Sequence, residues 1–160
     1  MLLAIAAGVL VWQMTRPCFF VQGEKGILAV VPVYGQMDFS LQFIHSVQKT
    51  PVIENLKVNE KLDGFVLQST KYQSFGVGLP FLASEGTFHQ EGDYFVMDGM
   101  ERPYTMLSVR PGVGTELTLR LEDVEYRLYQ MVPLGSRVDL YLAPYYQRFL
   151  EGVEANDGKT

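Results

Sequence analysis

Two histidines and a small set of carboxylates carry most of the chain's capacity for chemistry. His45 lies in segment 39–47 and Glu54 in segment 52–58, where apolar and polar residues alternate as in half-buried strands. If residues 48–51 form a four-residue hairpin loop, the residue numbers of each cross-strand pair have the same sum. His45 then pairs with Glu54 on the apolar face. Burying an ionisable pair is costly unless both members are satisfied. The pair therefore either holds the hairpin in register or lines a pocket mouth, where Glu54 would set the tautomer of His45.

Two catalytic arrangements are alternatives to this pair. A nucleophilic triad would combine Ser46 with His89 and with Asp93 or Asp98, but neighbouring residues on a strand face opposite ways and Ser46 would depend on a distant histidine. A metal site could draw on His45, Glu54, His89 and Asp93, whose spacing matches no known metal motif. We therefore predict no catalytic residue, no metal and no cofactor.

A glycine-containing segment, Gly-Val-Gly-Leu-Pro at 76–80, follows a predicted strand. Its backbone amides could cradle an anion, but the strand-to-helix context and the length of a nucleotide-binding fingerprint are missing. Gly-x-Gly followed by proline breaks a strand ladder, which favours a bend at the end of the strand.

Short alternating runs separated by turn residues predict an all-β domain that positions these residues. About nine strands are expected, at residues 26–33, 39–47, 52–58, 65–75, 94–97, 104–110, 116–121, 125–132 and 137–142, with 81–93 as a loop. Short connections favour a mostly antiparallel sandwich or barrel. Residues 145–153 show helical spacing and predict a short amphipathic helix that packs back on the domain.

The N-terminus predicts a hydrophobic segment that precedes this domain. Residues 1–12 are all apolar or small, and the apolar character continues with interruptions to residue 21. Because neither a basic leader nor a small-x-small cleavage pattern is visible, an uncleaved membrane anchor is favoured over a signal peptide. A buried N-terminal strand or helix of a soluble protein stays open as the alternative. The expected organisation is therefore an anchor or signal at 1–22, one β domain at 23–153 and a mobile tail at 154–160.

Composition limits the possible partners. The 160-residue chain has a net charge of −5 and 48% hydrophobic residues, enough for one core. Its 13 basic residues are scattered, which argues against nucleic acid. The single cysteine, Cys18, excludes an intramolecular disulfide.

Two motifs resemble a bacterial family, DUF1850, a domain of unknown function. The first is Phe-Ile-His-Ser-Val-Gln-Lys-Thr-Pro-Val-Ile-Glu at 43–54, and the second is Ser-Phe-Gly-Val-Gly-Leu-Pro at 74–80. Members of that family are small envelope proteins often encoded beside tripartite ATP-independent periplasmic (TRAP) transporters of the TAXI type. The resemblance, which covers about residues 26–142, implies a candidate ligand site made of His45, Ser46, Thr50, Glu54, Ser74, Gly76, Gly78 and Pro80.

The resulting expectation is a membrane-anchored, extracytoplasmic accessory or ligand-binding module of a TAXI-type TRAP transporter. Its partners would be a membrane permease or a solute-binding protein, and the membrane itself through residues 1–22. Two alternatives stay open: a hydrolase or metal-dependent enzyme that uses His45 and Glu54, and a purely structural envelope protein.

Overall fold

A computed structural model describes residues 1–74, 79, 80, 82 and 84–154, and for residues 151–154 it describes the backbone only. The elements follow the order α1 (Leu2–Thr15), β1 (Pro17–Gly23), β2 (Gly26–Pro32), β3 (Asp38–Ile44), β4 (Pro51–Val58), β5 (Phe65–Tyr72), β6 (Thr87–Glu91), β7 (Tyr94–Tyr104), β8 (Met106–Val109), β9 (Thr118–Leu121), β10 (Val124–Arg127), α2 (Leu128–Met131), β11 (Val138–Pro144) and α3 (Gln147–Glu154).

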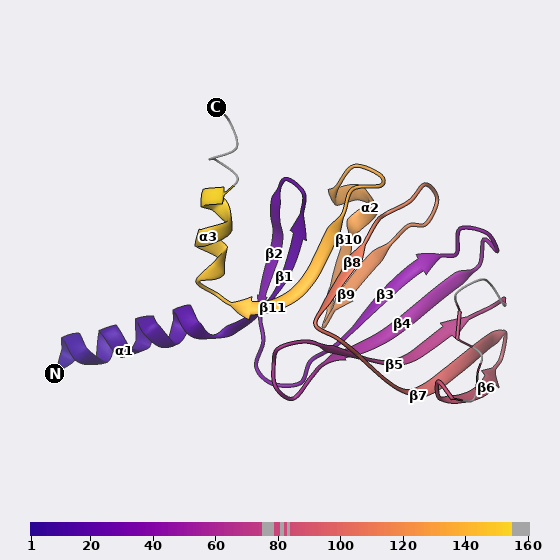
Figure 1. Cartoon of the computed structure of the whole chain (residues 1–160), viewed down its shortest axis with the longest axis horizontal. Helices are drawn as coiled ribbons and strands as arrows, with labels where there is room; N and C mark the ends of the chain where they lie inside the picture. The colour runs from indigo at the N-terminus through magenta and orange to yellow at the C-terminus, as the bar shows by residue number, and fades with distance from the viewer. Residues whose placement is uncertain (75–78, 81, 83, 155–160) are drawn as a thin grey trace.

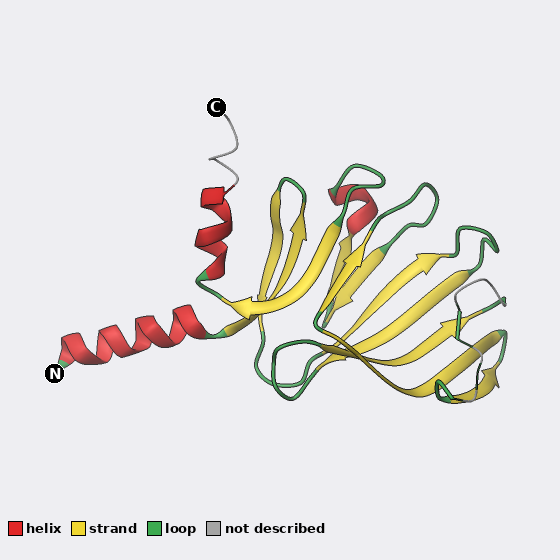
Figure 2. Cartoon of the chain, in the orientation of Figure 1, coloured by secondary structure: helices red, strands yellow, loops and turns green. Residues whose placement is uncertain are grey.

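The strands form two antiparallel sheets (Figures 1 and 2). The small sheet has the order β2-β1-β11-β8, and the large sheet has the order β10-β9-β3-β4-β5-β7-β6. The prediction of a mostly antiparallel all-β fold with an N-terminal and a short C-terminal helix is confirmed. The two sheets remain separate and do not close into a barrel. Because the large sheet has three more strands, it extends beyond its partner towards β6 (Figure 1).

An aromatic cluster joins the two sheets. Phe19 of β1 packs edge-on against Phe39 of β3, with ring centroids 5.1 Å apart, and its ring centroid is also 5.1 Å from that of Phe65 on β5. All three rings belong to one buried core, to which both sheets contribute. Their burial removes large apolar areas from water, and edge-to-face packing adds to that gain.

Strand β1 is buried on both faces. Phe19 and Val21 point into the main core, while Cys18 and Phe20 belong to a second cluster that includes Ala143. The Phe20 ring stacks on Tyr141 at 5.2 Å. A strand covered on both faces is continuously apolar, so in the sequence this run resembles a continuation of the predicted anchor. Helix α1 ends at Thr15, and residues 17–22 are part of the β domain.

Three other boundaries differ from expectation. Strand β6 forms within segment 81–93, which was expected to be a loop. Strand β7 continues through Asp98 and Gly99, where a turn was expected, because Gly99 adopts φ 70° and the pairing with β5 shifts around Gln68. Strand β10 ends at Arg127 and is followed by a single helical turn, α2.

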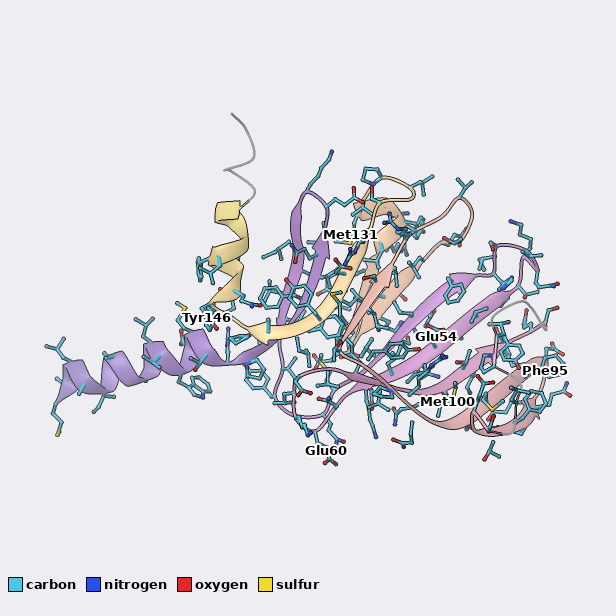
Figure 3. All side chains as sticks on the ribbon, in the orientation of Figure 1. Glu54, Glu60, Phe95, Met100, Met131 and Tyr146 are labelled. Atoms are coloured by element: carbon cyan, nitrogen blue, oxygen red, sulfur yellow. The ribbon has the colours of Figure 1, made fainter. Side chains whose placement is uncertain are left out.

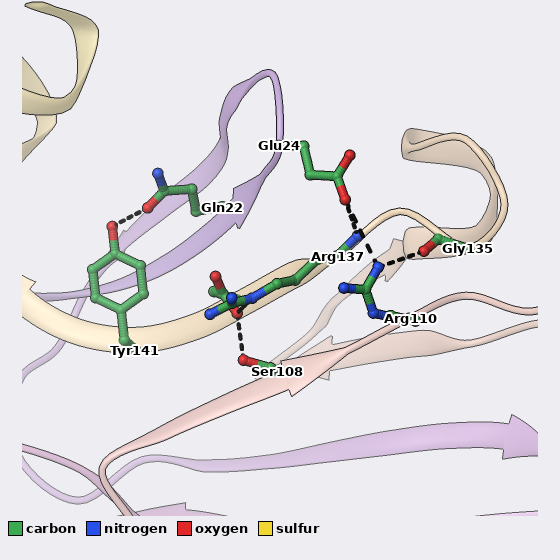
Figure 4. Close-up of polar contacts among 8 residues, drawn as sticks. Gln22, Glu24, Ser108, Arg110, Gly135, Arg137 and Tyr141 are labelled. Atoms are coloured by element: carbon green, nitrogen blue, oxygen red, sulfur yellow. Dashed lines mark hydrogen bonds and ion pairs between the residues drawn. The ribbon is translucent and has the colours of Figure 1, made fainter. Parts of the chain in front are cut away.

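Polar contacts fasten one end of the small sheet (Figure 4). The backbone N–H of Arg137 donates to Glu24 Oε1 at 2.8 Å, which ties the start of β11 to the β1–β2 turn. Arg110 Nη1 donates to the carbonyl of Gly135 at 2.8 Å and lies 3.8 Å from Glu24 Oε1. Further along, the Tyr141 hydroxyl donates to Gln22 Oε1 at 2.6 Å. These contacts hold the strands of the small sheet in register.

Helices α1 and α3 meet at the opposite end of the small sheet (Figure 1). The backbone N–H of Tyr145 donates to the Arg16 carbonyl at 3.0 Å, and that of Tyr146 donates to the Met14 carbonyl at 2.9 Å. The Arg16 guanidinium lies 5.2 Å from the centre of the Tyr145 ring. Helix α1 projects away from the sheets and buries none of its side chains. Among the described residues, no helix is both long enough and apolar enough to cross a membrane.

Candidate functional site

His45 caps the hairpin that joins β3 to β4. Its ring Nδ1 accepts hydrogen bonds from the backbone N–H groups of Val47, at 3.3 Å, and Gln48, at 3.1 Å. Its own backbone N–H donates to the Thr50 carbonyl at 2.9 Å, which closes the loop. Because Nδ1 is the acceptor, a neutral ring carries its proton on Nε2. His45 is buried and has a structural task in the loop.

The hairpin register differs from the expected one. Glu54 lies opposite Leu41, and Val52 lies opposite Phe43, so His45 and Glu54 are not cross-strand partners. The loop comprises residues 45–50. This length is stabilised because the His45 ring accepts hydrogen bonds from backbone amides of the loop and because Lys49 adopts φ 56°. The shift is an even number of positions, which keeps Glu54 on the face that also carries Leu56. Thr50 and Glu54 are four residues apart on an extended strand, or about 13 Å. The enzyme alternative based on adjacent His45 and Glu54 therefore loses its geometric basis.

The two family-like motifs meet at this end of the large sheet. The Ser74 hydroxyl donates to Gln48 Oε1 at 3.3 Å, which joins the segment after β5 to the hairpin loop. The Tyr72 hydroxyl donates to the Pro80 carbonyl at 2.6 Å. Thr50 has a buried hydroxyl with no hydrogen-bond partner among the described residues, whereas Ser46 is exposed. Gly76 and Gly78, two further candidate residues, lie outside the described part of the chain.

Glu54 lies on β4 in the large sheet (Figure 3), and it shares the inner face of the sheet with the buried Leu56 and Val58. In one row across the sheet it pairs with Leu41 on one side and Thr70 on the other, and Met97 follows on β7. Those three neighbours are buried, while Glu54 is half-buried. Burial raises the pKa of the Glu54 carboxyl above its ordinary value, and the positive charge of Arg102 opposes that shift. The site therefore favours a protonated carboxyl or one that receives a hydrogen bond.

The surroundings of Glu54 offer little compensation for its charge. The Thr70 hydroxyl donates to the Met100 sulfur at 3.6 Å, although sulfur is a weak acceptor. Within the described residues, the Glu54 carboxylate makes no hydrogen bond and no ion pair. Its acceptor capacity is thus available to another molecule.

A groove of about 730 Å³ lies along β7, next to the row of residues that contains Glu54 and Met97. Residues 84–87 form one side, and residues 99–103 of β7, including Met100 and Arg102, form the other. Gly86 packs so closely on the Asp98 carbonyl that a Cβ there would overlap it. Arg102 is not among the residues that the sequence predicts for the site, because Asp98-Gly99 predicts a turn at that point. Apolar and polar residues do not alternate through 94–104, so the sequence carried no pattern that points to Arg102.

His89 lies on the other face of the large sheet. Met97 points into the core, so the neighbouring β7 residues Val96 and Asp98 point outward, and His89 pairs with Val96. Its ring Nε2 is 3.1 Å from Glu91 Oε1 and 3.6 Å from Asp98 Oδ2. Glu54 faces inward, so the considered metal set of His45, Glu54, His89 and Asp93 is not assembled.

The considered serine triad is likewise not assembled. Ser46 is in the β3–β4 loop, and β6, which carries His89, lies three strands beyond β4 in the sheet order. With neighbouring strands about 4.8 Å apart, that separation is about 14 Å. Asp93 lies in the turn between β6 and β7. His89 does contact Asp98, but no serine nucleophile accompanies this pair among the described contacts.

A family model, Domain of unknown function (DUF1850), matches residues 39–128, which is more than half of the chain. The chain belongs to this family. The DUF1850 match begins within β3 and ends at α2, so it spans the large sheet and β8. Strands β1, β2 and β11 of the small sheet lie outside it. All eight candidate residues fall inside the DUF1850 region. No curated protein and no solved structure matches the chain.

Proposed function

We propose that this DUF1850 protein is a membrane-anchored, extracytoplasmic ligand-binding module that serves a TAXI-type TRAP transporter. The single observation that carries the binding role is the Glu54 carboxylate, half-buried on the inner face of the large sheet and without a hydrogen-bond partner among the described residues. A buried carboxylate with a raised pKa weakens the fold when ionised. Such a group is characteristic of functional sites.

The chemistry around Glu54 indicates the kind of ligand. An ionised carboxylate only accepts hydrogen bonds, so the ligand should offer a hydroxyl or amino group. The neighbouring Leu41, Thr70 and Met97 make the site mainly apolar, and Arg102 supplies a positive charge at longer range. A small organic solute with both an apolar part and a hydrogen-bond donor fits these neighbours. The proposed action is binding without chemical conversion.

The membrane anchor is supported by helix α1 and its surroundings. The helix has 14 residues without a charged side chain, and its large apolar residues are exposed on every side. Such a surface is unfavourable in water and requires a lipid or protein environment. At 1.5 Å per residue the helix is about 21 Å long, so entry into the membrane would involve neighbouring residues or only part of the bilayer.

Helix α3 adds a second apolar surface near the anchor. Phe149 and Leu150 are exposed, and the backbone hydrogen bonds from Tyr145 and Tyr146 to the end of α1 keep this surface close to the helix. Arg16 and Arg148 lie beside the Tyr145 ring. Aromatic and basic side chains next to an apolar helix are typical of a membrane interface. This arrangement supports a domain held close to the bilayer.

The transporter role rests on the family resemblance and is tested by uptake measurements in a strain that lacks this gene. The wild-type protein should restore uptake, and it should co-purify with a TAXI-type TRAP permease of the same organism. The Glu54→Gln variant should be folded and present at the wild-type level, yet fail to restore uptake. Glu60→Gln changes an exposed carboxylate that lies just beyond the end of β4, and it should behave as wild type. Full uptake with Glu54→Gln, together with no co-purification, would contradict the proposal.

A further inference from the structure

The outer face of the large sheet carries a cluster that is separate from the inner-face site. His89 and Glu91 are two residues apart on β6 and therefore point the same way. Asp98 of β7 pairs with Thr87, one row from the pair His89–Val96 on the same face. The three side chains converge from two adjacent strands, so the β6–β7 ladder fixes the spacing of their backbones.

The distances suit a single metal ion. His89 Nε2 lies 3.1 Å from Glu91 Oε1 and 3.6 Å from Asp98 Oδ2, and one ligand atom of each residue lies within 4.8 Å of the other two. Ligand atoms around a tetrahedral zinc ion, with bonds near 2.1 Å, are about 3.4 Å apart. Two of the three separations already lie near that value. Small side-chain rotations would bring the two carboxylates to the same spacing.

The charges also balance. Two carboxylates and a neutral imidazole neutralise a divalent cation, and an imidazole with carboxylates suits zinc and similar first-row transition metals better than Mg²⁺ or Ca²⁺. Lys71 Nζ lies 2.8 Å from Glu91 Oε2 and acts as an internal cation in the cluster. An arriving metal ion would compete with Lys71 for Glu91. Because Lys71 is long and partly exposed, its ammonium can move into solvent.

The floor beneath the cluster is apolar. Val96 pairs with Lys71 on one side and with His89 on the other, and it is fully buried although it belongs to the outer face. The side chains above it therefore cover it from solvent. The three ligand side chains are between 38% and 50% exposed, which leaves an ion free access from solution.

We propose that His89, Glu91 and Asp98 form a binding site for a divalent transition metal ion of the zinc class, with Lys71 as the competing internal cation. Binding would join the edge strand β6 to β7 and release Lys71 from Glu91. The competing explanation is a plain ion-pair cluster that holds β6 in place without a metal. The two explanations make opposite predictions for Lys71.

Zinc titration of the full chain, followed by the NMR signals of its two histidines, tests this site. Zn²⁺ should shift the His89 signals at a stoichiometry of one, whereas the His45 signals should stay in place and serve as an internal control. The variants His89→Ala, Glu91→Gln and Asp98→Asn should each weaken zinc affinity by about tenfold or more. Asp93→Asn, in the adjacent turn, should leave it unchanged. Mg²⁺ should leave the His89 signals in place.

Lys71→Met provides the deciding measurement. If the cluster binds a metal, removing the competing cation should strengthen zinc binding, by several-fold, and zinc should raise the melting temperature of this variant more than that of the wild type. If the cluster is only an ion-pair network, Lys71→Met should lower the melting temperature without any gain in zinc binding. The proposal would be overturned by that second result, or by zinc binding that survives His89→Ala.

Discussion

Glu54 and Thr70 face each other across the β4–β5 pair on the inner face of the large sheet, yet the Thr70 hydroxyl donates to the Met100 sulfur. The carboxylate is therefore left without a hydrogen bond among the described residues, in a row otherwise made of buried side chains. Burial raises the pKa of Glu54 for this reason, against the opposing charge of Arg102. The fold keeps an ionisable carboxyl where an amide or an apolar group would be more favourable, which is the physical basis of the proposed binding site.

Glu54→Gln should stabilise the protein at neutral pH. The pKa of Glu54 is higher in the folded state than in the unfolded state, so ionisation weakens the fold as the pH rises through that interval. Below the unfolded pKa, near pH 4, wild type and variant should be equally stable. Above the folded pKa the variant should be the more stable one. Urea unfolding at a series of pH values measures the difference.

For the matched variant Glu60→Gln, the difference in free energy of unfolding from wild type should not increase with pH over the same range. A Glu54→Gln protein that is less stable than wild type at neutral pH would contradict the assigned cause of the pKa shift, and it would favour a structural role for Glu54.

His45→Ala should lower the free energy of unfolding by about 1–2 kcal/mol, because the amides of Val47 and Gln48 lose a buried acceptor. His45→Asn should recover part of that loss, since an asparagine side chain accepts from backbone amides two or three residues ahead in turns. Denaturant unfolding of the three proteins gives the comparison. Equal stability of His45→Ala and wild type would show that the cap contributes nothing.

If α3 takes part in the proposed membrane contact, Phe149→Ser combined with Leu150→Ser should weaken binding of the full chain to phospholipid vesicles by about tenfold or more, because two exposed apolar side chains would no longer be buried in lipid. Trp12, the single tryptophan, lies on exposed α1, and its fluorescence should shift to shorter wavelength when vesicles are added. Val113→Ser, at an exposed apolar residue outside α1 and α3, is the control. Unchanged binding of the double variant would remove α3 from the membrane contact.

Cys18 should be unreactive in the native protein. The residue is fully buried in β1, and burial raises the pKa of its thiol, with the nearby charge of Arg16 in opposition. Since the thiolate is the reactive form, labelling by iodoacetamide should be slower than in urea by a factor on the order of a hundred. Mass spectrometry of timed samples gives both rates. Fast labelling under native conditions would mean that β1 is not held in the small sheet.

The local pattern of the sequence was sufficient for the strands that are buried on one face. Alternation in segments 39–47 and 52–58 predicted β3 and β4 and assigned Glu54 to the apolar face, because side-chain direction in a strand depends only on its period of two. The helical spacing near the C-terminus likewise predicted α3. The two motifs at 43–54 and 74–80 indicated the family, and the family match confirms it.

Elements that depend on distant contacts were not visible in the same way. Strand β1 looked like part of an anchor because the core covers one face and the Phe20 cluster covers the other, which removes the alternation. The partner of Glu54 depended on where the loop ends, and that was decided by the His45 ring and by the left-handed backbone of Lys49. A register shift of an even number of residues leaves the apolar pattern unchanged, so the pattern could not distinguish the two pairings.

The sequence by itself thus determined the fold class, the family and the face on which Glu54 lies, because these follow from local periodicity and short motifs. Only the tertiary structure decided that His45 and Glu54 are apart, that Arg102 acts on Glu54, and that His89, Glu91 and Asp98 converge on the outer face. Those relationships depend on which strands are neighbours and in which register, and both are set by contacts between residues far apart in the chain.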